Sequence, residues 1–236
     1  MRQITEALFS MQDEKYRAFH GALMPTVERE RIIGVRMPAL RRYAAALAKK
    51  PEAALFLLEL PHTYYEENNL HALLLMREKD FDVLMPQLER FLPEIDNWAT
   101  CDLFKPACFA QNRKGLLPYL SEWLCSDRPY TVRFAIEMLM THYLREDFSP
   151  EYPAWVAAVS SEHYYVRMMQ AWYFATALAF RYEELLPYLT QERLSPWVRQ
   201  KTIQKAVESL RLSPAQKEEL KALRREAPPR KTSCFG

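Results

Sequence analysis

The sequence predicts an all-α fold, and three observations support this: scarce glycine, prolines near the starts of segments, and an internal repeat. The chain of 236 residues holds four glycines beside sixteen prolines. Glycine makes up ~7% of an average protein, and both β-hairpins and phosphate-binding loops consume it. Proline, in contrast, suits the first turn of a helix. This composition favours helices that are joined by short turns.

The internal repeat is clearest in the second half of the chain. Three segments begin alike: YTVRFA at 130–135, YYVRMM at 164–169 and PWVRQK at 196–201. The Val-Arg pair recurs after 34 residues and again after 32, and apolar residues follow it at helical spacing. A second amphipathic stretch separates successive openings. Two helices per period indicate an α-solenoid, and because the signatures of TPR and ankyrin repeats are absent, HEAT-like helix pairs remain.

We therefore expect at least ten helices, no strand of consequence, and equivalent positions for Val132, Val166 and Val198 in successive helix pairs. An irregular helical bundle, in which the Val-Arg echoes are coincidental, is the alternative. We expect a single repeat domain over residues 1–225 that forms a curved, concave surface. A disordered C-terminal tail over residues 226–236 would follow it.

The composition also limits the class of protein. Hydrophobic residues make up 49% of the chain and charged residues 26%, as in ordinary globular proteins. No segment approaches ~20 uninterrupted apolar residues and no signal peptide is evident, so we expect no membrane contact and a location in the bacterial cytoplasm. The cysteines lack metal-ligand spacing, so we expect reduced thiols and no bound metal. They are Cys101 and Cys108, which we expect on one helix, and Cys125 and Cys234.

A net charge of +2 does not by itself indicate a nucleic-acid-binding protein, so the placement of the positive residues matters. Equivalent positions line up along a solenoid, and Arg133, Arg167 and Arg199 should therefore form a row. They lie in the first turn of predicted helices, where backbone N–H groups favour anions. Such a row suits a phosphate backbone, but the same arginines could instead pair with carboxylates between repeats. Arg36 and Lys105 are further candidates for phosphate contact.

One predicted helix start carries a different pattern. Trp98 and Asp102 are four residues apart and share one face of a helix. They lie one repeat before Arg133, and Trp172 lies about two turns into a later helix. The four side chains could converge on one cleft, although core packing alone would also explain the Trp-Asp pair.

These residues resemble the AlkD-like DNA alkylation repair proteins. The stretches that carry the resemblance are GVRMPALRRY at 34–43, DNWATCD at 96–102, VR at 132–133 and VRMMQAW at 166–172. The resemblance covers nearly the whole chain and implies a HEAT-like solenoid that binds duplex DNA on a basic concave face. Active relatives hydrolyse the N-glycosidic bond of N3- or N7-alkylated purines without extruding the base. It implies a DNA glycosylase that acts, we expect, as a monomer and without a cofactor.

Site residues follow from the resemblance by position. Asp102 matches the catalytic carboxylate, Trp98 and Trp172 match the aromatic walls against the sugar of the lesion, and Arg133 matches a residue that contacts the DNA backbone. The chemistry agrees with these roles. A cationic alkylpurine leaves without a general acid, so the developing sugar cation is what needs stabilisation, by a carboxylate and by indole faces.

A second function stays open on the sequence alone. The chain could be a non-catalytic repeat protein that binds branched or distorted DNA, or a protein partner. Asp102 favours the enzyme, because a carboxylate in a phosphate-binding groove would repel its ligand. The segment 64–67 could form a cleft wall or a packing contact between repeats. His71, His142 and His163 are expected at the surface or partly packed.

Overall fold

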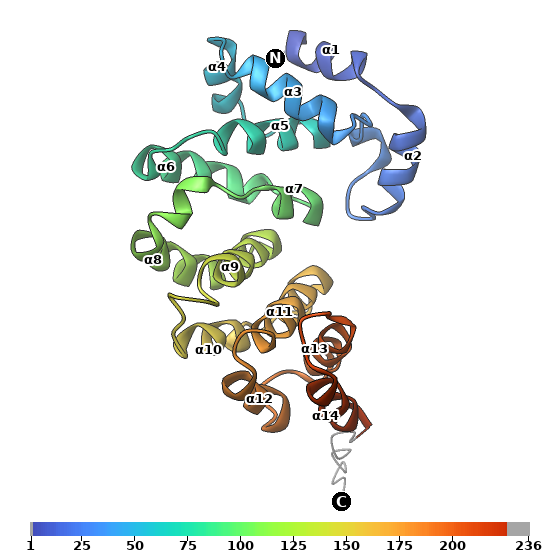
Figure 1. The fold of residues 1–236 in the computed structure, drawn as a ribbon. Helices are drawn as coiled ribbons and strands as arrows, with labels where there is room; N and C mark the ends of the chain where they lie inside the picture. Colours follow the sequence, from blue (N-terminus) through green and yellow to red (C-terminus); the bar gives the residue numbers. More distant parts are fainter. Residues whose placement is uncertain (1, 226–236) are drawn as a thin grey trace, which may run out of the picture. The chain divides into compact units, whose positions relative to one another are not determined.

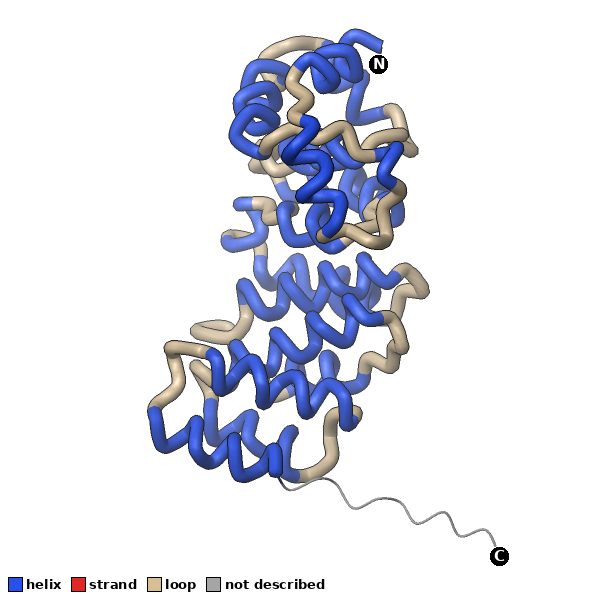
Figure 2. Tube along the Cα trace, turned by 90° about the vertical axis from the view of Figure 1, so that its right-hand side faces the viewer, coloured by secondary structure: helices blue, strands red, loops and turns tan. Residues whose placement is uncertain are grey.

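The computed structural model describes residues 2–225, and the regular secondary structure of this part of the chain is helical. It holds fourteen α-helices, with three short 3-10 turns between them. Figure 2 shows helices and loops, and within the described residues the only β-type pairing is an isolated antiparallel bridge between Gln12 and Val35. The predictions of an all-α fold and of at least ten helices are confirmed. The expected tail over 226–236, with Cys234, lies outside the described residues.

The chain divides into two compact units, Met1–Leu117 and Pro118–Gly236, and the boundary falls inside one helix. The helices of the first unit are α1 (Arg2–Ser10), α2 (Glu14–Ala22), α3 (Met37–Leu47), α4 (Glu52–Leu58), α5 (Tyr65–Leu75), α6 (Phe81–Phe91) and α7 (Trp98–Leu103) (Figure 1). Its 3-10 turns are η1 (Arg29–Arg31), η2 (Leu92–Glu94) and η3 (Ala107–Ala110). The boundary helix is α8 (Arg113–Leu124). The second unit holds α9 (Pro129–His142), α10 (Glu151–Ala158), α11 (Tyr164–Leu178), α12 (Tyr182–Thr190), α13 (Pro196–Glu208) and α14 (Pro214–Arg225).

Within the described residues, no helix combines the length and the apolar character that a membrane crossing needs. The single repeat domain over residues 1–225 stays a prediction.

Helix α5 is the centre of the first unit. Helices α3, α4, α6 and α7 all pack against it, and all eleven of its residues are buried. Its sequence is YEENNLHALLL, so burial includes two glutamates, two asparagines and a histidine. Charged side chains are almost never fully buried unless they are paired. The polar residues of α5 therefore need partners in the segments around it.

Glu66 of α5 binds the backbone of a loop that is distant in sequence. Its carboxylate accepts hydrogen bonds from the backbone N–H groups of Ile33, Gly34 and Val35, at 2.8, 2.7 and 3.2 Å. Burial raises the pKa of Glu66, and the three N–H donors oppose that shift because they favour the charged form. Glu66 thus fixes the loop that leads into α3.

Gly34 is required at the middle of that loop. Its φ is +95°, a conformation that side-chain-bearing residues rarely adopt. A Cβ atom there would lie 2.5 Å from the Cβ of Arg17 and 2.9 Å from the carbonyl oxygen of Asp13. The close approach of the α2 backbone therefore explains this glycine, the first residue of the GVRMPALRRY stretch.

Glu67 closes the start of α5. Its carboxylate accepts the backbone N–H groups of Thr63 and Tyr64, at 3.1 and 3.0 Å, and the hydroxyl of Thr5 at 2.7 Å. The first two bonds satisfy backbone donors at the helix start, as in a capping box. The segment 64–67 is therefore a packing contact, which was one of the two alternatives left open by its sequence.

The second unit contains the helices that carry the Val-Arg repeat. Helix α11 packs against α9 on one side and against α13 on the other, while the shorter α10 and α12 pack on α11 (Figure 1). Val132, Val166 and Val198 lie in the first turns of α9, α11 and α13, and all three are buried. The three valines therefore hold similar places near the helix starts, which is compatible with the predicted repeat.

Two expectations about cysteine and histidine are wrong. Cys101 lies on α7 and Cys108 on the 3-10 turn η3, so they are not on one helix, because Pro106 separates the two elements. Both are buried. His71 is fully buried rather than near the surface, and its Nδ1 lies 2.9 Å from Nε2 of His62. His142 and His163 are partly packed, as expected.

The buried histidine pair makes stability depend on pH. His62 stacks on Phe56 and His71 on Phe91, with ring centroids 4.5 and 4.2 Å apart. Burial lowers the pKa of His62 to about 4 and that of His71 to about 3. An unfolded chain would bind these protons at about pH 6.5, so the unfolded state gains protons first as the pH falls.

We predict that the free energy of unfolding decreases between about pH 6.5 and pH 4, by roughly 1.4 kcal/mol per pH unit for each histidine. Above pH 6.5 the pair contributes no such loss, since both states are neutral there. Urea unfolding across this range measures it. The variant His62→Gln/His71→Gln should show a flatter dependence even if it is less stable at pH 7. An unchanged slope in the double variant would contradict the prediction.

Candidate functional site

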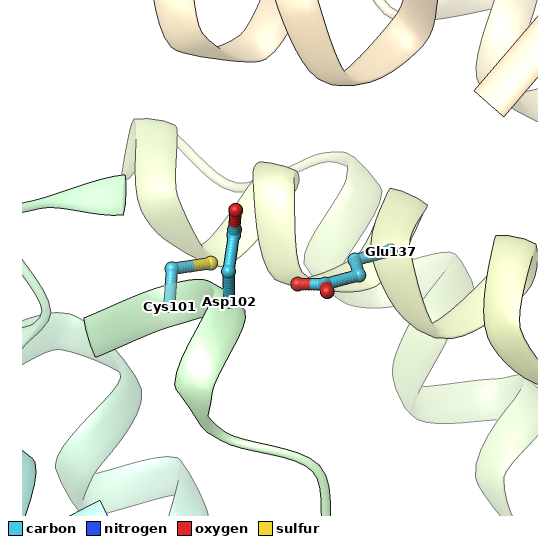
Figure 3. Close-up of side chains that lie close together, drawn as sticks. All are labelled: Cys101, Asp102 and Glu137. Atoms are coloured by element: carbon cyan, nitrogen blue, oxygen red, sulfur yellow. The ribbon is translucent and has the colours of Figure 1, made fainter. Parts of the chain in front are cut away.

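Helix α7 carries the Trp-Asp pair and is only six residues long. Asn97 caps its start: its side-chain oxygen accepts the backbone N–H of Thr100 at 2.8 Å. Trp98 is the first helical residue, and Asp102 follows one turn later. Figure 3 shows Asp102 beside Cys101 on this helix, while Glu137, also drawn there, belongs to α9. A single turn of helix therefore sets the spacing between the indole and the carboxylate.

A chain of hydrogen bonds fixes the start of α7 from both sides. On one side, the Thr100 hydroxyl donates to Oδ1 of Asn69 on α5 at 2.9 Å. On the other, the amide of Asn97 donates to Asp96 at 2.9 Å, and Asp96 forms an ion pair of 2.6 Å with Arg31. Asn69, Asn97 and Thr100 are buried, where unpaired polar groups are costly, so their bonds specify one geometry.

The indole of Trp98 is positioned by one hydrogen bond and by packing on an apolar cluster. Its indole N–H donates to the carbonyl oxygen of Leu23 at 3.1 Å. The ring packs on a small buried cluster that comprises Met24, Val27, Ile32 and Tyr65. Trp98 and Asp102 are both half-buried, so each keeps part of its surface accessible to a ligand.

Trp172 lies on α11 in the second unit, about two turns into the helix as predicted. Its side chain is 42% exposed, which is unusual for an indole on a helix that is otherwise largely buried. The Nζ atom of Lys205 lies 5.7 Å from its ring centroid. Trp172 lines two adjoining hollows of about 330 and 300 Å³. An exposed aromatic face next to a cation is thus available to a ligand in this unit.

The first and last arginines of the predicted row bind backbone carbonyls. Arg133 is 4% exposed and donates to the carbonyl oxygen of Tyr165 at the start of α11, at 2.8 Å. Arg199 donates to the carbonyl oxygens of Leu189 and Leu223, at 2.6 and 3.0 Å. These bonds join successive helices of the second unit, so the arginine has a structural role in the first and last openings.

The remaining candidates are Arg167, Arg36 and Lys105. Arg167 forms an ion pair of 2.7 Å with Glu162, and its guanidinium lies 4.7 Å from the ring centroid of Trp197. In the first unit Arg36 is exposed and forms an ion pair of 2.8 Å with Asp13. Lys105 is exposed in the turn after α7. Arg133 is thus buried, Arg167 and Arg199 are half-buried, and Arg36 and Lys105 are exposed.

The groups that position the site escaped the sequence reasoning. Asn97 carried a local signal, since asparagine before an apolar stretch is a common helix cap. Asn69, Arg31 and Leu23 carried none, because each is distant in sequence from the α7 group that it binds. The exposed cations near Trp172 were missed for a related reason: Arg145 and Arg211 lie in the turns that follow α9 and α13, outside the repeat openings.

Comparison with known proteins adds one finding. The model of a protein family described as "DNA alkylation repair enzyme" matches residues 4–207. No curated protein matches the chain significantly. The matched range includes the Trp-Asp pair of α7, the Val-Arg openings of α9, α11 and α13, and Trp172. The chain therefore belongs to the family of DNA alkylation repair enzymes.

Proposed function

We propose that this chain is a DNA glycosylase that hydrolyses the N-glycosidic bond of cationic N3- or N7-alkylated purines in duplex DNA, without extruding the base. One observation carries the proposal: an indole and a carboxylate lie one turn apart on a helix whose start is fixed by buried hydrogen bonds. Preorganised charge of this kind is what a developing sugar cation requires.

Asp102 is the proposed catalytic group. The alkylated purine already carries a positive charge, so it can depart as a neutral base without a proton donor. Positive charge then develops on the deoxyribose, and the Asp102 carboxylate would stabilise it and orient the attacking water. Trp98 would present its indole face to the same cation, whose attraction to an aromatic ring adds to that of the carboxylate.

Trp172 is the second proposed aromatic wall. Its exposure in the second unit supports a role in ligand contact, and the family resemblance assigns it to the same nucleotide as Asp102. We further propose that the helix pairs are HEAT-like repeats with a concave DNA-binding face. Equivalent first-turn valines in α9, α11 and α13 support that part of the proposal.

The predicted DNA-binding residues divide into two proposed groups. Arg36, Lys105 and Arg167 would contact phosphates directly, since their side chains are not fully buried. Arg133 and Arg199 would support the DNA-binding helices through their bonds to backbone carbonyls. The phosphate contacts would supply affinity without sequence preference, as a lesion-directed enzyme needs.

Asp102→Asn should reduce release of N7-methylguanine and N3-methyladenine by a factor on the order of 10²–10³, while folding and DNA binding persist. Asparagine keeps the shape of the side chain but removes the charge that stabilises the sugar cation. The measurement counts bases released from methylated duplex DNA under single-turnover conditions.

Asp82→Asn is the matched control, because Asp82 is exposed on α6 of the same unit and should be dispensable. An active Asp102→Asn variant would remove Asp102 from the catalytic role. A wild-type protein that binds duplex DNA but releases no base would instead favour the second candidate, a non-catalytic protein for branched or distorted DNA.

DNA affinity should fall steeply with salt. Each phosphate that a cation neutralises adds ~0.9 to the slope of log affinity against log salt concentration. Fluorescence anisotropy with an unmodified duplex, measured between about 50 and 200 mM salt, gives this slope. Affinity that stays flat over this range would argue for a protein partner rather than for DNA.

A further inference from the structure

The two hollows beside Trp172 form one groove, which lies wholly in the second unit. They share Trp172, Thr176 and Arg211 in their linings. The groove crosses the C-terminal parts of α9, α11 and α13 and the turns that follow α9 and α13. The repeat therefore brings three equivalent helix ends together around one exposed indole.

Three cations line this groove and lie over aromatic rings. Lys205 lies 5.7 Å from the ring centroid of Trp172. The guanidinium groups of Arg145 and Arg211 lie 4.9 and 5.7 Å from the ring centroid of Phe180. Among the described residues, none of the three cations takes part in a salt bridge. A guanidinium that lies over a ring keeps its N–H groups available to an anion.

The residues that line the groove carry a net positive charge. Glu208 is the one carboxylate that the two linings contain, and it accepts a hydrogen bond from Gln204 at 3.1 Å. Three cations against one carboxylate leave an excess of positive charge in a chain that is nearly neutral overall. Leu210, between Ser209 and Arg211 at the edge of the groove, is 97% exposed and offers an apolar contact.

We infer that this groove binds the phosphodiester backbone of DNA, with phosphates on Arg145, Lys205 and Arg211 and a deoxyribose against Trp172. Arginine forks bind phosphate oxygens in pairs, and the indole offers an apolar face to the sugar between them. The inference rests on the proposed function for its DNA ligand. It differs in assigning contact with the DNA backbone to Lys205 near the end of α13 and to Arg145 and Arg211 in the turns after α9 and α13. Arg133 and Arg199 of the Val-Arg row already bind carbonyl groups.

A different experimental result would be expected if these cations had only a structural role. Helix C-terminal ends carry partial negative charge, and nearby cations offset it by about 0.3–1 kcal/mol each. If that were their whole role, removing the charges would lower thermal stability and leave DNA affinity unchanged.

The test compares two triple variants with the same change in net charge. The groove variant is Arg145→Gln/Lys205→Gln/Arg211→Gln. The control is Arg193→Gln/Lys217→Gln/Lys221→Gln, which removes cations of the same unit that do not line the groove. Arg193 also lies over an aromatic ring, that of Tyr188 at 5.3 Å, so the control includes one cation with the same kind of contact. Binding of an unmodified duplex is measured by anisotropy over a salt series, together with thermal melting of both variants.

The groove variant should lose at least tenfold in affinity, and its salt slope should decrease by about 2–3, because ~0.9 is lost for each phosphate contact. The control should stay close to wild type in both. Equal losses in the two variants, or wild-type binding by the groove variant, would overturn the inference.

Base release from methylated DNA separates this inference from the proposed function. If wild type releases alkylated bases while the groove variant binds DNA normally, the groove inference fails and the glycosylase stands. If binding depends on the groove but wild type releases no base, the groove stands and the glycosylase fails. A wild-type protein that binds no duplex DNA would overturn both.

Discussion

The buried polar side chains of α5 are the constraint on which the first unit depends. A helix with every residue buried must satisfy its charged and amide groups inside the protein, because an unpaired one is costly. Glu66 does so on the loop at 33–35, and Asn69 on Thr100 of α7. Each partner lies about 31–33 residues away in sequence. The cost of leaving these groups unpaired therefore selects one arrangement of three segments around α5.

This constraint reaches the candidate site through α7. A six-residue helix has too few internal hydrogen bonds to be stable alone, so its position depends on tertiary contacts. Asn69 fixes Thr100, the ion pair of Arg31 fixes Asp96, and the Leu23 carbonyl fixes the indole of Trp98. Side chains that must act on a reacting bond need such support, since small errors in position are costly.

In the second unit the same requirement is met by arginine. Each Val-Arg opening places an apolar side chain in the core, and in two of the three, at Arg133 and Arg199, the guanidinium donates to carbonyl groups of neighbouring helices. A guanidinium offers five donors and can therefore satisfy several carbonyl groups at helix ends, as Arg199 does. A separate group of cations, Arg145, Lys205 and Arg211, lies towards the opposite ends of these helices, around Trp172.

The sequence by itself determined the helical fold, the repeat of the second unit, the spacing of Trp98 and Asp102, and the family. These features are local or periodic in the sequence. Residues that are only a few positions apart are therefore enough to specify them, through the geometry of the helix. Only the tertiary structure decided which polar groups are buried and paired. It buried His71 against His62, separated Cys101 from Cys108, and turned Arg133 towards a backbone carbonyl. Such outcomes depend on tertiary contacts, between residues nine positions apart for His62 and His71 and 32 apart for Arg133 and Tyr165, or on a break in a helix. No local pattern specifies them.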